Sequence, residues 1–198
     1  MTAMGKFKII SISGPSNAGK DTIVNELYLR LQGEHPGKVY KSHYYTTRKV
    51  MRPGEVRDEY FLTSEEFDEK KQRGDFAFFG ENDNYQVGTA KNECFKNEIV
   101  LVNIAAQFVE KLKELAKQNG GECFSIFVWA DEEERVFRGQ LRESWLFSEI
   151  PRYRIDHDIV KETAETARGI DLIIENKEGK LEETTGEIAM KVEYFINS

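Results

Sequence analysis

Short apolar runs and helical repeats alternate along most of the chain. The run Lys6–Ser13 (KFKIISIS) is rich in isoleucine and is followed by Gly14 and Pro15, which predicts a buried strand that ends in a loop. In the segment Lys20–Gln32 the apolar residues fall on one face at helical spacing, and Gly33 is placed to end the helix. A strand, a glycine-containing loop and a helix are therefore predicted in direct succession.

Three further apolar runs are too short for helices and are predicted as strands: Glu98–Asn103, Phe124–Trp129 and Asp171–Ile174. Apolar residues at helical spacing follow two of them, at Phe108, Leu112 and Leu115 and at Ile188, Val192 and Phe195. Alternating strands and helices are typical of a mostly parallel sheet with helices on both faces. We therefore expect an α/β fold of three layers. The aromatic and glycine-rich segment from about Tyr40 to Lys91 breaks this alternation, which predicts an inserted, β-rich lobe.

The loop after the first predicted strand matches a phosphate-binding motif. Gly14 to Lys20 (GPSNAGK) fits the first seven positions of the P-loop pattern G-x-x-x-x-G-K and lies between a strand and a helix, as that motif requires. Glycines let the backbone curl around phosphates, the helix N-terminus adds positive potential, and the lysine reaches the outer phosphates. An ordinary glycine-rich turn is the alternative. We expect a nucleoside triphosphate to be bound by Gly14, Pro15, Ser16, Asn17, Ala18, Gly19, Lys20, Asp21 and Thr22.

One position of this loop departs from the pattern. The lysine is normally followed by a serine or threonine whose hydroxyl holds magnesium, but here Asp21 follows it, and Thr22 comes next. A carboxylate is also a hard oxygen ligand, and the strand Glu98–Asn103 ends in Asn103, where many P-loop enzymes have a metal-directed aspartate. Our hypothesis is that the magnesium carboxylate has moved to Asp21. The alternative is that Asp21 is simply an acid in the first turn of a helix.

Arginines gather in the segment after the strand Phe124–Trp129. Arg135, Arg138 and Arg142 are spaced i, i+3 and i+7, so a helix presents them on one face, and Arg152 and Arg154 follow. Such a cluster suits the neutralisation of a phosphoryl group in transfer. Alternatively, each arginine is a surface residue paired with nearby acids.

Motifs in the β-rich lobe and beyond it carry a family resemblance. They are Thr46-Thr47-Arg48, Arg52-Pro53-Gly54-Glu55, Tyr60, Ser64–Phe67, Val87-Gly88-Thr89 and Asn176. In this order, and together with the P-loop, they resemble guanylate kinases over nearly the whole chain. The resemblance implies a single domain of residues 1–198, in which a P-loop core of about 5–39, 92–130 and 165–198 carries an acceptor-binding lobe (40–91) and a helical lid (131–164).

The resemblance also implies roles for individual residues. It implies transfer of a phosphoryl group from ATP, with Mg2+, to a small phosphorylated acceptor, and it assigns catalysis to Lys20, Arg138, Arg142 and Arg154. The acceptor would be held by Tyr44, Arg48, Arg52, Tyr60 and Thr89. Arginines suit this task because a guanidinium group makes forked, charge-assisted bonds to phosphate.

The acceptor itself is left open by the sequence. Where guanylate kinases recognise the guanine base, this chain has Tyr44, Phe78 and Ala105, and Glu81 and Tyr85 are nearby candidates for the same role. GMP or dGMP is the family default. Ribose 1,5-bisphosphokinases are the alternative, because Gly19-Lys20-Asp21, His43-Tyr44-Tyr45 and Leu101-Val102-Asn103 resemble them. Two other classes are an inactive guanylate kinase-like module that binds phosphopeptides and a P-loop hydrolase.

Composition narrows the classes of partner. The formal net charge is −7, which argues against nucleic acid, and no apolar run is long enough for a membrane span. We expect a cytoplasmic protein with small-molecule partners, and the oligomeric state is left open. Cys94 and Cys123 lack metal-ligand spacing and are interpreted as reduced thiols that hold no zinc. His35, His43 and His157 show no pattern of a nucleophile or a metal ligand.

Overall fold

The chain forms two compact units. The computed structural model describes residues 7–49, 60–81, 85–140 and 169–198. One unit comprises Met1–Tyr40 together with Asn97–Ser198, and the other comprises Lys41–Lys96. None of the helices within these described ranges is both long and apolar enough to cross a lipid bilayer.

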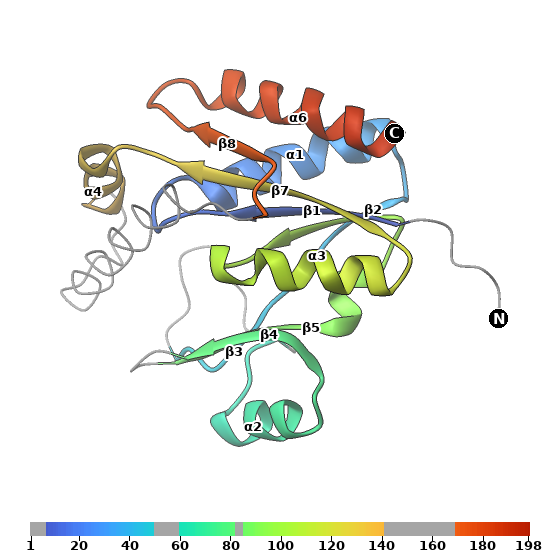
Figure 1. Ribbon diagram of the computed structural model, residues 1–198. Helices are drawn as coiled ribbons and strands as arrows, with labels where there is room; N and C mark the ends of the chain where they lie inside the picture. The colour runs from blue at the N-terminus through green and yellow to red at the C-terminus, as the bar shows by residue number, and fades with distance from the viewer. Residues whose placement is uncertain (1–6, 50–59, 82–84, 141–168) are drawn as a thin grey trace. The chain divides into compact units, whose positions relative to one another are not determined.

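The first unit is built on a five-stranded sheet with the order β2-β6-β1-β7-β8 (Figure 1). β1 runs parallel to both of its neighbours, β6 and β7, and β8 runs parallel to β7. All six residues of β1 are buried, as expected for the central strand of a sheet that is covered on both faces. The strands are β1 (Lys8–Ser13), β2 (Val39–Lys41), β6 (Ile99–Asn103), β7 (Glu122–Trp129) and β8 (Leu172–Glu175).

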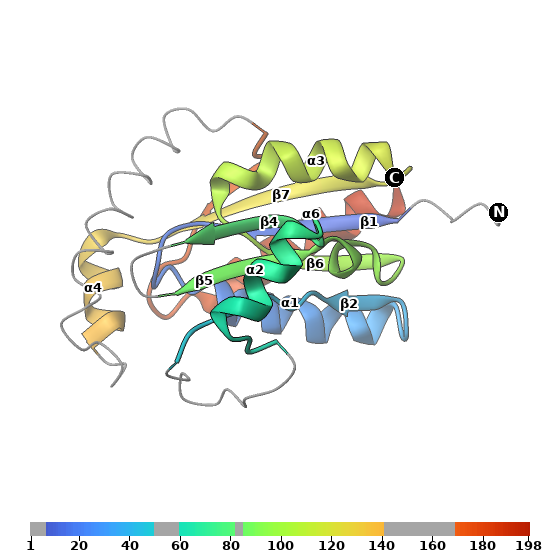
Figure 2. The ribbon, with the colours of Figure 1, turned by 90° about the horizontal axis from the view of Figure 1, so that it is seen from below.

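Helices cover both faces of this sheet. α1 (Lys20–Glu34) and α6 (Leu181–Asn197) lie on one face and α3 (Val109–Gln118) on the other, as Figures 1 and 2 show. A short 3-10 helix, η2 (Ala106–Phe108), precedes α3, and α4 (Glu132–Gln140) follows β7. The side chains of α1 and α6 pack on the sheet in one apolar core, which includes Ile10, Ile12, Ile23, Leu27, Leu101, Ile126, Ile188 and Val192. The predicted α/β fold with a mostly parallel sheet between helices is confirmed.

Two details of the helix predictions are wrong. Gly33 does not end α1, which continues to Glu34, and His35 caps it with its N–H on the carbonyl of Leu31 at 2.7 Å. The stop comes from Pro36, because a residue before proline is disfavoured in the helical conformation, and His35 has φ −125° and ψ 64°. In α3 the buried residues are Val109, Leu112 and Ala116, whereas Phe108 lies in η2 and Leu115 is only partly buried.

The second unit contains a three-stranded antiparallel sheet with the order β3-β5-β4. Its elements are β3 (Tyr45–Thr46), α2 (Ser64–Gln72), β4 (Phe76–Glu81), β5 (Gln86–Ala90) and the 3-10 helix η1 (Lys91–Phe95). A capping box starts α2: the Thr63 hydroxyl accepts from the N–H of Glu66, and the Glu66 carboxylate accepts from that of Thr63. Phe67 on α2 stacks on Phe76 of β4 with ring centroids 4.5 Å apart. This unit therefore has an apolar core of its own.

Candidate active site

The loop between β1 and α1 is curled by residues with positive φ angles. Gly14 and Gly19 have φ angles of 140° and 88°, and Asn17 has 61°. Glycine reaches such angles without strain, and asparagine does so more readily than most residues. Space also requires glycine here, because a Cβ atom on Gly14 would lie only 1.9 Å from the carbonyl oxygen of Val128. The loop therefore turns back on itself instead of continuing β1.

The start of α1 presents positive charge at this loop. Nζ of Lys20 donates to the carbonyl oxygen of Pro15 at 2.6 Å, so the ammonium group lies across the loop. α1 has 15 residues, and its positive dipole end begins at Gly19, where no side chain caps the helix. A lysine ammonium, a curled backbone and a helix N-terminus together form an arrangement that can bind a polyphosphate.

Two residues from other elements contact the same loop. Asn176, which follows β8 and is 5% exposed, donates from Nδ2 to the carbonyl oxygen of Ala18 at 2.8 Å. Arg138 on α4 donates from one guanidinium nitrogen to the carbonyl oxygen of Asn176 at 2.7 Å and to Glu134 at 2.8 Å. Its other terminal nitrogen lies 3.5 Å from the carbonyl oxygen of Asn17. The structure therefore brings Arg138, one of the four predicted catalytic residues, to the P-loop near Asn17 and Gly19.

The two polar residues noted at the predicted metal position are in contact. Nδ2 of Asn103, at the end of β6, donates to Oδ1 of Asp21 at 2.7 Å. Asp21 is exposed in the first turn of α1, beside Lys20. The bond fixes one carboxylate oxygen, and an exposed carboxylate in this place fits a hard cation such as Mg2+. Thr22, which follows Asp21 and is also predicted to bind the triphosphate, is exposed as well.

Several predicted residues lie outside the described part of the chain. These are Arg52, Arg142 and Arg154, together with Arg152 and His157. Arg135, the first arginine of the predicted cluster, is 2% exposed and donates from Nε to the carbonyl oxygen of Ala130 at 3.2 Å. Its side chain therefore packs inside the first unit, and it does not lie on an open face with Arg138.

In the second unit, two of the predicted acceptor residues lie close to β3. The N–H of Thr46 donates to the carbonyl oxygen of Tyr60 at 2.8 Å, and the N–H of Arg48 donates to the Thr46 hydroxyl at 3.2 Å. The Tyr60 ring stacks on His43 with centroids 4.5 Å apart, and the Arg48 guanidinium lies 6.0 Å from the centroid of the Phe61 ring. The backbone of β3 thus holds Arg48 and Tyr60 on neighbouring segments.

The remaining predicted acceptor positions differ in exposure. Thr89, on β5, is 6% exposed and pairs with Phe78 across the sheet, and Tyr44 is half-buried. Phe78 is itself 3% exposed, so an apolar core residue occupies one position aligned with base recognition. Glu81, a suggested replacement, is exposed; its carboxylate accepts from Lys71 at 2.5 Å, and this bond lowers the pKa of Glu81. Ala105 in the first unit is exposed and offers no polar side chain.

Sequence reasoning missed the contacts of Asn176 and Arg138 with main-chain carbonyl groups and the contact between Asp21 and Asn103. These contacts of Asn176 and Arg138 could not be predicted, because a main-chain carbonyl group has no sequence signature. The bond between Asp21 and Asn103 joins residues 82 positions apart. The only sign of this bond in the sequence is a pair of departures from the usual P-loop pattern. Asp21 has a carboxylate in place of a hydroxyl group, and Asn103 has an amide in place of a carboxylate.

The two cysteines described in the structure are free thiols. Cys94 is buried, and its Sγ donates to the carbonyl oxygen of Ala90 at 3.8 Å. Burial raises the pKa of the Cys123 thiol, and a hydrogen bond with the Ser125 hydroxyl opposes that effect in part. An activated cysteine nucleophile has an accessible thiol with a lowered pKa. The burial of Cys94 and the raised pKa of Cys123 are the opposite of these properties.

A parallel sheet whose central strand leads through this loop into a helix defines a P-loop α/β protein. The model of one family, described as guanylate kinase, matches residues 6–193. The chain therefore belongs to the guanylate kinase family.

Individual relatives agree with this assignment. The chain is 29% identical over 182 residues to "Guanylate kinase 2, chloroplastic/mitochondrial" of Oryza sativa subsp. japonica, covering 88% of this chain and 59% of the rice protein. It is 31% identical over 193 residues to a guanylate kinase of Clostridioides difficile (strain 630), covering 87% of this chain and 89% of that protein. A crystal structure of guanylate kinase from Anaplasma phagocytophilum has a TM-score of 0.66 and 22% identity, covering 99% of this chain and 88% of that one. At that identity the structural likeness supports the fold.

Proposed function

We propose that this protein is an ATP-dependent nucleoside monophosphate kinase. The observation that carries the proposal is the P-loop, in which Lys20 lies across a curled backbone at the start of α1, in a chain that matches the guanylate kinase family over residues 6–193. A phosphopeptide-binding module would need neither the lysine nor the curled loop, so their presence favours catalysis.

Positive charge at the loop supports phosphoryl transfer. The triphosphate would bind the main-chain N–H groups of the loop, and Lys20 would exchange its bond with the Pro15 carbonyl for one to a phosphate oxygen. Arg138, whose guanidinium is already oriented by Glu134 and the Asn176 carbonyl, would stabilise the charge that develops on the transferred group. No covalent enzyme intermediate is required.

The proposed reaction uses Mg2+ bound with ATP. The ion would neutralise negative charge on the phosphate groups. Asp21 would be its protein ligand, and Asn103 would orient the carboxylate through the 2.7 Å bond. Asp21→Asn should raise the magnesium concentration needed for half-maximal rate by at least about tenfold, and Asn103→Ala should raise it less. Glu26→Gln, on an exposed acid of the same helix, is the matched control. An unchanged magnesium requirement in Asp21→Asn would remove Asp21 from the site.

The second unit would supply the acceptor site. Arg48 and Tyr60, with Arg52, would hold the acceptor phosphate, and Tyr44 and Thr89 would contribute hydroxyl groups. GMP or dGMP is the acceptor proposed by family membership. Arg142 and Arg154 are proposed to join Arg138 around the triphosphate. The cytoplasmic location also remains a prediction.

The decisive experiment measures ADP release from ATP and Mg2+ in the presence of GMP, dGMP, AMP, UMP, CMP or ribose 1,5-bisphosphate. We expect acceleration by GMP and dGMP, and a loss of at least about 100-fold in Lys20→Ala, because a charge that stabilises the transition state is removed. Lys117→Ala, an exposed lysine of α3, is the control. Acceleration by ribose 1,5-bisphosphate alone would replace the proposed acceptor, and no acceleration by any acceptor would overturn the kinase proposal.

A further inference from the structure

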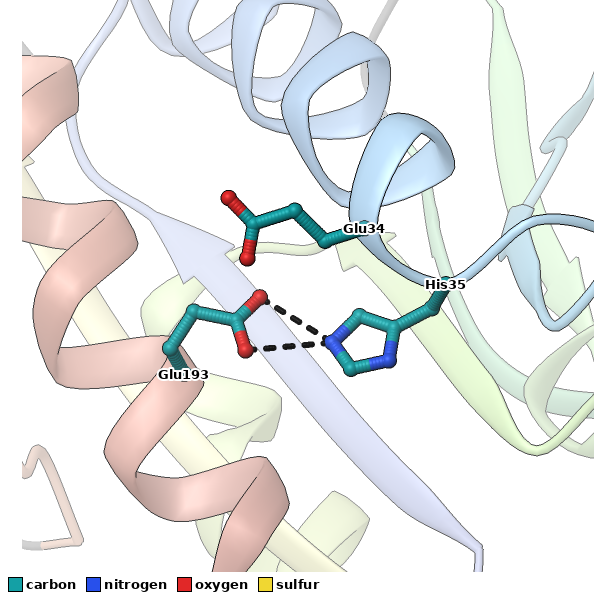
Figure 3. Close-up of side chains that lie close together, drawn as sticks. All are labelled: Glu34, His35 and Glu193. Atoms are coloured by element: carbon teal, nitrogen blue, oxygen red, sulfur yellow. Dashed lines mark hydrogen bonds and ion pairs between the residues drawn. The ribbon is translucent and has the colours of Figure 1, made fainter.

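The far end of α1 brings together three potential metal ligands from two distant parts of the sequence. Glu34 and His35 follow each other at the C-terminus of α1, and Glu193 lies on α6, 158 positions after His35. Figure 3 shows the His35 ring directed at the Glu193 carboxylate, with Glu34 beside them. One ligand atom from each residue lies within 4.8 Å of the others.

The geometry of the closest pair fits shared coordination. Nε2 of His35 lies 3.1 Å from both Oε1 and Oε2 of Glu193. Two ligand atoms bound to one tetrahedral zinc ion at about 2.0–2.1 Å are separated by about 3.3 Å, close to this value. Glu34 is exposed, so its carboxylate can rotate to close the remaining gap of at most about 1.5 Å.

The surroundings of these residues also favour a cation. α1 and α6 both end near this cluster, and neither helix has a basic residue in its last turn. The negative dipole ends of two helices and two carboxylates therefore meet at one histidine, which gives the place a negative potential.

Neighbouring groups hold the ligands in position. His35 is anchored by its backbone N–H, which donates to the carbonyl oxygen of Leu31 at 2.7 Å. Asn197 donates from Nδ2 to the Glu193 carbonyl oxygen at 2.8 Å and lies 3.4 Å from Oε2 of the same residue. Support of this kind orients metal ligands in proteins.

We propose that Glu34, His35 and Glu193 form a binding site for a divalent transition-metal ion of the zinc class, which clamps the C-terminal ends of α1 and α6 together. One nitrogen and two oxygen ligands suit Zn2+ and Co2+, whereas Mg2+ prefers oxygen ligands alone. The site is separate from the nucleotide loop, because α1 has 15 residues and therefore places about 22 Å between its two ends. Water completes the coordination.

Titration of the nucleotide-free protein with ZnCl2 tests the proposal, with calorimetry for stoichiometry and thermal unfolding for stabilisation. We expect one zinc ion per chain and a rise in Tm of about 5–10 °C at a hundredfold excess over Kd. MgCl2 at the same concentration should leave Tm unchanged. Co2+ should give the visible absorption of a tetrahedral site.

Substitutions identify the ligands. Glu34→Gln leaves the packing of the helices intact and should weaken zinc binding by at least about tenfold, and His35→Gln should remove it. His43→Gln, on an exposed histidine of the other unit, should bind zinc like the unchanged protein. Both cysteines and Asp21 remain in every variant. Equal zinc binding by His35→Gln and the unchanged protein would overturn the proposal and leave His35 and Glu193 as an ion pair.

Discussion

The hydrogen bond from Asn176 to the P-loop can be removed by one substitution. Asn176→Ala deletes the donor to the Ala18 carbonyl but leaves two main-chain bonds of residue 176 intact, one to Trp129 and one from Arg138. Ala18 is fully buried, so its carbonyl loses a partner at a place where water is excluded. The substitution therefore isolates the contribution of one buried side-chain bond.

The expected loss of stability follows from this burial. A buried polar group left without its partner costs about 1–3 kcal/mol. For a chain of this size each kcal/mol lowers Tm by about 2–4 °C, which gives a decrease of about 2–12 °C. Affinity for ATP should fall as well, because the loop loses a contact that holds its shape.

Urea unfolding followed by circular dichroism measures the change in free energy. Asn119→Ala is the matched control, because Asn119 also donates from Nδ2 to a carbonyl oxygen, that of Leu115, at 2.8 Å, but is exposed. Water can replace that bond, so the control should lose less than about 0.5 kcal/mol. If Asn176→Ala is no less stable than Asn119→Ala, burial does not determine the strength of this bond and the reasoning is refuted.

Three further substitutions or modifications test other features. Gly14→Ala should destabilise the protein by about 1–3 kcal/mol in urea unfolding, because its Cβ would lie 1.9 Å from a main-chain oxygen that cannot rotate away. Gly186→Ala should instead stabilise it by about 0.5–1 kcal/mol, since this residue lies inside α6 with its nearest neighbour, a nitrogen of Arg30, at 3.9 Å. Cys123 should react with iodoacetamide more slowly than a free thiol at pH 8, because burial raises its pKa and leaves less thiolate, and the rate should increase as pH rises.

Each of these expectations has a contrary outcome. A stable Gly14→Ala protein would mean that the loop relaxes without cost, and a destabilised Gly186→Ala protein would show a close contact at α6. Alkylation of Cys123 in the folded protein at the rate seen in urea would mean that the thiol is accessible, and mass spectrometry would distinguish it from Cys94.

The local parts of the fold could be predicted because their causes are local. The P-loop was recognisable since seven consecutive residues, Gly14 to Lys20, specify its backbone angles and its lysine. The buried strand before it and the amphipathic helix after it follow from the periodicity of apolar residues. Even there the pattern misplaces the end of α1, because Gly33 fits a helix stop whereas the restriction that Pro36 imposes on His35 ends the helix after Glu34.

Only the tertiary structure decided which distant side chains meet. Asp21 and Asn103 are 82 positions apart, and His35 and Glu193 are 158 positions apart. Asp21 meets Asn103 because the parallel strands β1 and β6 end at the same edge of the sheet. His35 meets Glu193 because α1 and α6 pack on the same face of that sheet (Figure 1). Periodicity along the chain carries no information about such contacts, since it records which side of an element is buried and not what lies opposite. The chemistry of the phosphate loop was therefore readable from the sequence, while the proposed metal clamp at the other end of α1 became visible only in the folded chain.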